Sequence, residues 1–369
     1  MSNQRILAHE LDANISWSVI GLDLAKNDVS LVGITVDGEI IRVDRMSYEI
    51  LLEKAQAMTP TIFAMEPCSE MNHLVNQFEA MGHKCKVIGG CAVRNYINTY
   101  FAGQKNDLHD AEALAFLAKD SRLQSIRAKT PEEMQLVSLV TIREHYVDLY
   151  RKTLVSLKGI AQFWGLRISR LLSDEAKLIA KIEDTSNIPP ELKETLISMV
   201  KSYKALERTA NSLKKKIEAF ASKDEICKKV MEIPGVGAMI ATRLKATLGD
   251  VDRFEKPKRL PAYYGLVPRS FTTGHVQKMG HITKRGDKVM RTYLIQGAGA
   301  LLLLEKKGKL RDCQLKKWIA RKRQQLPYCK LVVALAAKIL RIIWAILYKG
   351  ERFNLKKAGV AKCSLSGIC

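Results

Sequence analysis

The sequence predicts a mixed α/β domain followed by a mostly α-helical second half. Between Ser16 and Lys119, short apolar runs rich in β-branched residues alternate with helical periods. From Thr130 onward, apolar residues recur at steps of three and four over long stretches, as in α-helices. A chain of 369 residues with 47% hydrophobic residues can form two or three domains with their own cores.

The first domain is expected to follow the order β-β-β-α-β-α-β-α. Asp37-Gly38 is a hairpin signal between the second and third strands. This is the element order of the ribonuclease-H-like (RuvC-like) fold, in which acids on the first strand, a later strand and the last helix meet at one end of the sheet. The strands are expected at 17–23, 29–36, 39–45, 61–65 and 84–88, and the helices at 48–57, 70–81 and from Asp107 onward.

Four acidic residues stand at positions suited to one shared site. Asp23 ends the first expected strand, and Glu66 ends the fourth, directly before a proline. Asp107 and Asp110 are three residues apart at a helix start and therefore lie on one helix face. Acids are also favoured in a first helical turn because they complement the helix dipole, so this pair alone is a weak signal.

Convergence of Asp23, Glu66, Asp107 and Asp110 would require divalent cations. Each pair of carboxylates about 4 Å apart repels by about 4 kcal/mol at an effective dielectric of about 20. Ligand sets made only of oxygen suit Mg²⁺ or Mn²⁺. Two such ions about 3.5–4 Å apart stabilise the attacking and leaving oxygens of a phosphoryl displacement. The sequence therefore predicts a Mg²⁺ (or Mn²⁺) site with catalytic carboxylates.

The chain is strongly basic. Sixty Lys and Arg against 38 Asp and Glu give a formal charge of +22, which predicts a polyanionic partner, with nucleic acid the leading candidate. The excess is sharpest between Lys306 and Lys357, although a solvated basic face is the alternative for any single run.

Cysteine usage and apolar runs indicate a cytoplasmic protein that binds no membrane. The eight Cys form no C-x-x-C pair and have no His at zinc spacing, so we expect reduced thiols. No basic segment followed by a long apolar run is found near the N-terminus. The apolar stretch Leu331 to Tyr348 carries Lys338 and Arg341 near its middle, which favours a buried helix over a membrane span.

Two long repeats predict a coiled-coil middle region, entered at a helix-start signal around Pro131. Their apolar positions alternate steps of four and three, and Arg143 is the only polar intruder. The two helices could pair with each other or with another subunit, and the pattern leaves both open. The repeats are Leu136, Val140, Arg143, Val147, Tyr150, Leu154, Leu157, Ala161, Trp164, and Leu192, Leu196, Met199, Tyr203, Leu206, Ala210, Leu213, Ile217, Phe220.

The segment Ile233-Pro-Gly-Val-Gly237 resembles the turn of a helix-hairpin-helix motif. It precedes the helical period from Ala238 to Leu248. Gly235 and Gly237 would let backbone N–H groups approach a phosphate at the start of that helix. A plain glycine cap between two helices is the competing interpretation.

A loop dense in hydroxyl groups is expected from Leu260 to Gly274. Thr273 stands directly before Gly274, and Ser270 is the only serine of the loop. A hydroxyl beside a glycine and among cations is placed to meet a phosphodiester, although a turn residue is the alternative. The cations in and after this loop include Arg269, Lys278, His281, Lys284, Arg285, Lys288 and Arg291.

Several motifs in this order resemble the DEDD-type insertion-sequence transposases related to Piv-type DNA invertases. The resemblance runs from about Val19 to Phe353. Its motifs are Gly-Leu-Asp23-Leu-Ala-Lys, Met-Glu66-Pro, Lys-Asn-Asp107-Leu-His-Asp110-Ala-Glu-Ala-Leu-Ala, Ile-Pro-Gly-Val-Gly, Tyr-Gly-Leu-Val-Pro-Arg and Gly-His-Ile-Thr-Lys-Arg-Gly-Asp.

The resemblance implies a DNA transposase or recombinase that excises and inserts its element by breaking and rejoining DNA. It implies that Asp23, Glu66, Asp107 and Asp110 bind the metal, and that a serine of the C-terminal domain is the nucleophile. Thr273 occupies the matching position here, and a secondary alcohol is stiffer than serine but still a competent nucleophile. Ser270 is the reserve candidate.

The resemblance also implies partners and boundaries. The partners would be DNA and, as in some members, a guide RNA, in a prokaryotic nucleoid. The coiled-coil repeats themselves would join further copies of the chain into a dimer or tetramer. The expected parts are an N-terminal extension at 1–15, a RuvC-like catalytic domain at 16–129, a coiled-coil region at 130–224, a C-terminal transposase domain at 225–353 and a tail at 354–369.

Two alternatives remain open from the sequence. A RuvC-like junction nuclease would use the carboxylates to activate water, without a covalent intermediate. A catalytically decayed transposase would act only as a nucleic-acid-binding protein.

Overall fold

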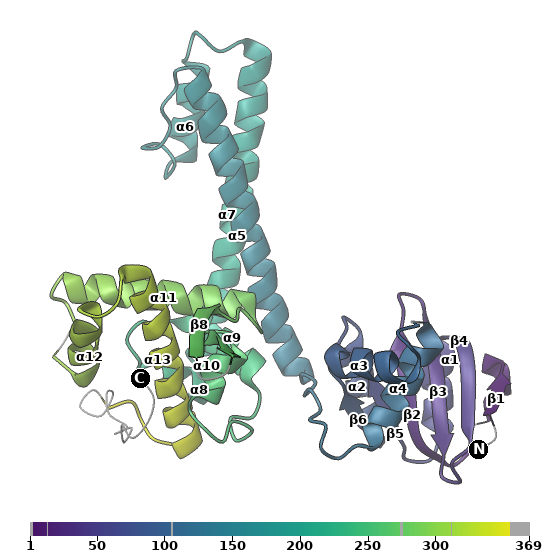
Figure 1. The fold of residues 1–369 in the computed structure, drawn as a ribbon. Coiled ribbons are helices and arrows are strands. Elements are labelled where there is room, and N and C mark those ends of the chain that lie inside the picture. Colours follow the sequence, from purple (N-terminus) through teal and green to yellow (C-terminus); the bar gives the residue numbers. More distant parts are fainter. Residues whose placement is uncertain (1–2, 13, 105, 274–275, 311, 355–369) are drawn as a thin grey trace. The chain divides into compact units, whose positions relative to one another are not determined.

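The computed structural model describes residues 3–12, 14–104, 106–273, 276–310 and 312–354, and within these ranges the side chains of 3, 272–273 and 276–278 are not described. The chain forms two compact units, Met1–Met134 and Gln135–Cys369 (Figure 1).

The first unit is built on a six-stranded sheet with the order β1-β4-β3-β2-β5-β6. The central strands β2, β3 and β4 are antiparallel neighbours, whereas β5 runs parallel to β2 and β6 parallel to β5. This confirms the mixed sheet with the ribonuclease-H-like strand order. The strands are β1 (Asn3–Ile6), β2 (Trp17–Leu24), β3 (Asp28–Thr35), β4 (Ile40–Ser47), β5 (Ile62–Met65) and β6 (Lys84–Val87).

Helices cover both faces of this sheet because alternate residues of its strands point to opposite sides. On one face, Ile20 and Leu22 of β2 share a core with α1 (Tyr48–Ala57) and α2 (Met71–Ala80). On the other face, a second core joins β2 and β5 to α3 (Gly90–Tyr100) and α4 (Asp107–Lys119).

Three elements of the first unit are absent from the sequence-based expectation, namely β1, the 3-10 helix η1 (Ala8–Glu10) and α3. β1 lies within the stretch expected as an N-terminal extension, and it adds a parallel strand beside β4. Its sequence, Asn-Gln-Arg-Ile, has no alternation that would predict a strand. α3 begins at the second residue of Gly89-Gly90, a pair that sequence rules assign to loops.

The long helices α5 (Pro131–Phe163) and α7 (Pro190–Ala221) form an antiparallel hairpin within one chain. Near one end of the hairpin Val140 shares a core with Ile217 and Ala221. Midway, the ring centroids of Tyr150 and Tyr203 lie 6.3 Å apart. Of the two alternatives for the apolar repeats, the structure therefore has the intramolecular pair.

A short helix packs at the tip of this hairpin. α6 (Glu175–Glu183) buries Leu178 and Ile182 against the ends of α5 and α7. Figure 1 shows α6 beside the far end of the long helices. The hairpin tip therefore has a small core of its own.

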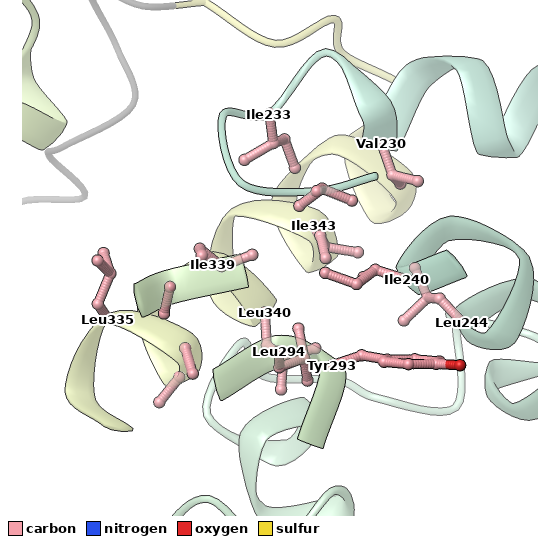
Figure 2. Packing of buried hydrophobic residues seen from close by; sticks show 14 of the residues in the cluster. Val230, Ile233, Ile240, Leu244, Tyr293, Leu294, Leu335, Ile339, Leu340 and Ile343 are labelled. Atoms are coloured by element: carbon pink, nitrogen blue, oxygen red, sulfur yellow. The ribbon is translucent and has the colours of Figure 1, made fainter. Parts of the chain in front are cut away.

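The rest of the second unit is mostly helical, as expected. Its core gathers residues of several helices, including Ile240, Leu294 and Ile343 (Figure 2). The elements are α8 (Glu225–Met231), α9 (Ala238–Leu248), α10 (Arg259–Tyr263), β7 (Pro268–Thr273), β8 (Val276–Ile282), α11 (Lys288–Lys306), α12 (Gln314–Arg323) and α13 (Tyr328–Lys349).

Helix α13 is long and apolar enough to cross a membrane, but it lies in this core. Of its most apolar 18-residue window, 61% is buried inside the protein. Leu335, Ile339 and Leu340 point into the cluster seen in Figure 2. These contacts agree with the buried helix expected from the sequence.

The segment expected as a hydroxyl-rich loop is instead a short helix and a β-hairpin. β7 and β8 pair antiparallel, with Thr273 opposite Val276. The run from Arg269 to Thr273 is rich in β-branched and aromatic residues, which favour strands over loops. The many hydroxyl-bearing residues also favour turns, which is why the sequence predicts a loop here.

Candidate active site

The strand register brings Asp23 and Glu66 together. β2 and β5 pair in parallel, with Gly21 opposite Ala64 and Leu22 opposite Met65. Continuing this register by one residue sets Asp23 beside Glu66. Neighbouring strands of a sheet are about 4.8 Å apart. Both residues are half-buried. Two of the four predicted carboxylates therefore share one edge of the sheet.

Helix α4 packs directly onto β2 at Gly21. A Cβ atom on Gly21 would lie 2.0 Å from the carbonyl oxygen of Ala111 and 2.6 Å from the amide nitrogen of Ala115. Only glycine permits so close an approach of helix and strand. Because Gly21 and Asp23 are two residues apart, they lie on the same face of β2, the face that α4 covers.

The first turn of α4 carries the other two acids. Asn106 caps the helix, and its side-chain oxygen accepts a hydrogen bond of 2.7 Å from the amide of His109. Asp110 is only 6% exposed, whereas Asp107 is exposed. The close contact at Gly21 thus brings the helix that bears both aspartates against the strand that carries Asp23 near its end.

Glu66 lies against the start of α3, a contribution that the sequence did not predict. A Cβ atom on Gly90 would be 3.1 Å from Oε2 of Glu66. The positive end of the helix dipole favours a carboxylate at this place. The Gly89-Gly90 pair is the signal that could have indicated it, because glycine lets a backbone approach a functional group closely.

Negative charge is concentrated at this sheet edge. The pKa of Tyr48 is raised, first by burial and then by the charges of Cys68, Glu70, Asp28 and Asp23. The Tyr48 hydroxyl donates a hydrogen bond of 2.6 Å to the carbonyl of Ala25, just after β2. The acids Asp23, Asp28 and Glu70 thus lie near the Tyr48 hydroxyl.

The β2–β5 register and the packing of α4 on β2 bring the backbones that carry these acids to one end of the sheet. Within the described ranges, no three His, Cys, Asp or Glu side chains are grouped to hold a metal ion. The donor set itself, acidic oxygens at one sheet edge, fits a hard divalent cation. The roles of Asp23, Glu66, Asp107 and Asp110 as ligands stay a prediction.

In the second unit, the two glycines of the predicted phosphate-binding turn have different surroundings. Gly235 has φ +88° and backs onto α11, where a Cβ on Gly297 would lie 2.2 Å from the Gly235 carbonyl oxygen. Gly237 caps α9, and no heavy atom lies within 4 Å of the position its Cβ would take. Gly235 therefore lets the turn pack closely on α11. At Gly237, the space beside the start of α9 is open.

Lys284 and Arg285 are exposed on a turn that is interlocked with a second turn. A Cβ on Gly265 would lie 2.4 Å from the amide nitrogen of Arg285, and a Cβ on Gly286 would lie 2.2 Å from the Tyr263 carbonyl oxygen. Both glycines have positive φ. The interlock holds two of the predicted phosphate-binding cations on a fixed backbone.

The β-hairpin of β7 and β8 connects these two turns along the chain. Arg269 and Ser270 are exposed on β7. Thr273 ends β7 and Lys278 lies within β8, but their side chains fall outside the described part of the chain. The nucleophile predicted at Thr273 is thus placed by its backbone alone.

A sheet of ribonuclease-H-like strand order, with acids near the ends of two neighbouring strands and on a packed helix, is the arrangement expected of an enzyme of metal-dependent phosphoryl transfer. Comparisons with known proteins identify the family of the chain. Residues 227–312 match the model described as Transposase IS116/IS110/IS902 family, and residues 20–163 match a Transposase model of the DEDD type of IS110 elements.

Individual relatives agree with the family models. The chain is 30% identical to the transposase for insertion sequence element IS1111A of Coxiella burnetii, with 91% of each chain covered. It is 25% identical to the transposase for insertion sequence element IS1328 of Yersinia enterocolitica, over 91% of this chain and 98% of the relative. A pilin gene-inverting protein of Moraxella bovis is 22% identical over 74% of this chain and 75% of its own length.

The chain belongs to the IS116/IS110/IS902 family of transposases. It is an insertion-sequence transposase whose catalytic DEDD domain implies use of a divalent metal, and a transposase binds DNA.

Proposed function

We propose that this transposase excises and inserts its element by metal-assisted phosphoryl transfer, with Asp23, Glu66, Asp107 and Asp110 as the metal ligands. The observation that supports this most is the β2–β5 register, which sets Asp23 beside Glu66 at the edge where α4 packs. Bound Mg²⁺, or Mn²⁺ in its place, would stabilise the attacking and leaving oxygens. The four carboxylates bind and orient it.

The proposed nucleophile is the hydroxyl of Thr273, with Ser270 in reserve. Its oxygen forms a new bond to phosphorus while the bond from phosphorus to the leaving sugar oxygen breaks. The threonine hydroxyl loses a proton and the sugar oxygen gains one, so the number of phosphoester bonds is conserved and the DNA can be rejoined. Cations neutralise the phosphate before attack, namely Arg269, Lys278, Lys284 and Arg285.

Trapping a protein–DNA adduct tests both halves of this proposal. Thr273→Ala and Thr273→Val should abolish the adduct and rejoining, whereas Thr273→Ser should retain or raise activity because it keeps the oxygen. Asp110→Asn should abolish cleavage while leaving the circular dichroism spectrum and DNA binding unchanged.

Three results would contradict the assignment. Normal recombination by Thr273→Ala together with inactive Ser270→Ala would move the nucleophile to Ser270. Cleavage without any adduct would favour a junction nuclease. Loss of the fold in Asp110→Asn would show that the acid is structural.

The proposed partners are the DNA of the element ends and target, further copies of the chain, and a guide RNA as in some family members. Apolar side chains left open on α5 support assembly: Val155 is 70% exposed and Phe163 is 84% exposed. Analytical ultracentrifugation of Val155→Lys and sequencing of copurified RNA test these two partners. If Val155→Lys has the same mass in solution as the unaltered protein, assembly through α5 is contradicted. The absence of a specific copurified RNA would count against a guide RNA.

A further inference from the structure

A half-buried ion pair joins β4 to α4 two residues beyond Asp110. The guanidinium of Arg42 contacts the carboxylate of Glu112, and their side chains are 17% and 12% exposed. Glu112 follows the two proposed ligands of α4 in sequence, yet its carboxylate is engaged by an arginine.

Arg42 lies on the face of the sheet that α4 covers. It is paired with Val32 of β3, and Val32 packs against Ala111 of α4. The ion pair therefore attaches α4 at a second strand, away from the contact at Gly21. Together the two contacts hold the helix at β2 and at β4.

The two contacts constrain different motions. The helix side that faces Gly21 presents small residues, Ala111 and Ala115, which set the depth of packing but do not interlock with the strand. A smooth alanine surface leaves rotation and sliding of the helix weakly opposed. A guanidinium–carboxylate contact is directional, so it fixes the helix along its axis and about it.

Stability alone is a weak explanation for this pair. Buried ion pairs often contribute less than apolar residues of the same volume, because both charges lose their hydration. In addition, the second terminal nitrogen of Arg42 is buried and has no hydrogen-bond partner among the described residues. A costly and incompletely satisfied charge is better explained by the orientation that it imposes.

We infer that Arg42 and Glu112 are positioning residues that hold the first turn of α4 in register over β2, so that the aspartates of that turn stay against the strand that carries Asp23. The inference rests on the proposed function, because it assumes that these two aspartates bind the metal. Glu112 is thereby an anchor of the site and not one of its ligands.

Four variants of the full-length protein test the inference. Arg42→Met and Glu112→Gln each break the pair, and the double variant Arg42→Glu/Glu112→Arg restores it in reverse. Arg45→Met is the matched control, because Arg45 lies on the same strand, is 78% exposed and reaches Asp28 only at 4.0 Å.

The first readout is Mn²⁺ affinity, measured by electron paramagnetic resonance titration. Loss of a group that orients ligands weakens metal affinity by about 10- to 100-fold. We expect that loss in both single variants, a recovery of at least about tenfold in the reversed pair, and no change in Arg45→Met. DNA cleavage should follow with a raised Mn²⁺ activation constant and a nearly unchanged maximal rate.

The second readout needs no metal. Hydrogen exchange of the α4 amides should accelerate in Glu112→Gln and return toward the original rate in the reversed pair. Glu112→Gln is nearly isosteric, so it serves if Arg42→Met fails to fold. Single variants that bind Mn²⁺ as tightly as Arg45→Met would overturn the inference, whether or not their melting temperatures fall.

Asp110→Asn separates this inference from the proposal on which it rests. If Asp110→Asn keeps full Mn²⁺ affinity and cleavage, the metal-site assignment fails. If Asp110→Asn loses both while Arg42→Met and Glu112→Gln lose neither, only the positioning role fails.

Discussion

Gly21 shows how one residue without a side chain can decide the geometry of the proposed metal site. It lies two residues before Asp23, and the backbone of α4 occupies the space that a side chain would need. The helix that carries Asp107 and Asp110 therefore approaches β2 as closely as two backbones can. Any larger residue must move the acids away from their strand partner.

Gly21→Ala should move α4 and abolish metal-dependent cleavage. The added methyl group overpacks the contact with Ala111, at a cost of about 1–3 kcal/mol in the free energy of unfolding. Urea denaturation and a cleavage assay with added Mg²⁺ measure the two effects.

Gly159→Ala provides the matched control. Gly159 lies inside α5, and no heavy atom comes within 4 Å of the position that its Cβ would take. Alanine should stabilise the helix there by up to about 1 kcal/mol and leave cleavage unchanged. Equal activity of the Gly21→Ala and Gly159→Ala proteins would show that the close contact is unimportant for catalysis.

The sequence indicates the candidate acids more readily than the residues that would arrange them. Asp23 and Glu66 each end an apolar run, which is a local pattern that places a carboxylate at a strand end. Gly21, Gly90 and Arg42 act through partners that are distant in sequence. No local period reveals such contacts, because they exist only once β2, α3 and α4 have packed.

At the scale of elements, long regular segments were predicted well and short ones poorly. The expected helix at 48–57 is α1 without any shift, because its capping serine and helical period agree. The β7–β8 hairpin was mistaken for a loop, since hydroxyl-bearing residues favour strands as well as turns. A strand as short as β1 becomes visible only beside its neighbour.

The α5–α7 hairpin makes a prediction about the middle of the chain. Val200 is fully buried in the small core at the hairpin tip. Val200→Lys should destabilise the tip by about 3–5 kcal/mol, because an unpaired charge would be buried. Hydrogen exchange of the α6 amides reports this change.

Ala205→Lys on the exposed side of α7 is the control and should leave exchange unchanged. Unchanged exchange in Val200→Lys as well would contradict the packing of α6 against α7 in the core at the hairpin tip.

For the whole molecule, the formal charge of +22 should dominate binding to DNA. With about six to ten phosphate contacts, affinity should fall about 10³- to 10⁵-fold between 50 and 200 mM salt, because bound protein releases condensed counterions. Fluorescence anisotropy with a labelled duplex gives the slope. A nearly flat salt dependence of the affinity would contradict a role of the basic excess in DNA binding.

The parallel strand β1 has a practical consequence for shortening the protein. Asn3–Ile6 occupy the hydrogen-bonding edge of β4 from Ile40 to Val43. A chain begun at Ser16 would leave that apolar edge as a template for further strands. Dynamic light scattering should then show slow growth of particles, whereas the full-length chain should keep a constant size. We therefore expect the residues of β1 to prevent aggregation through this edge, and biochemical work on the catalytic unit should retain them.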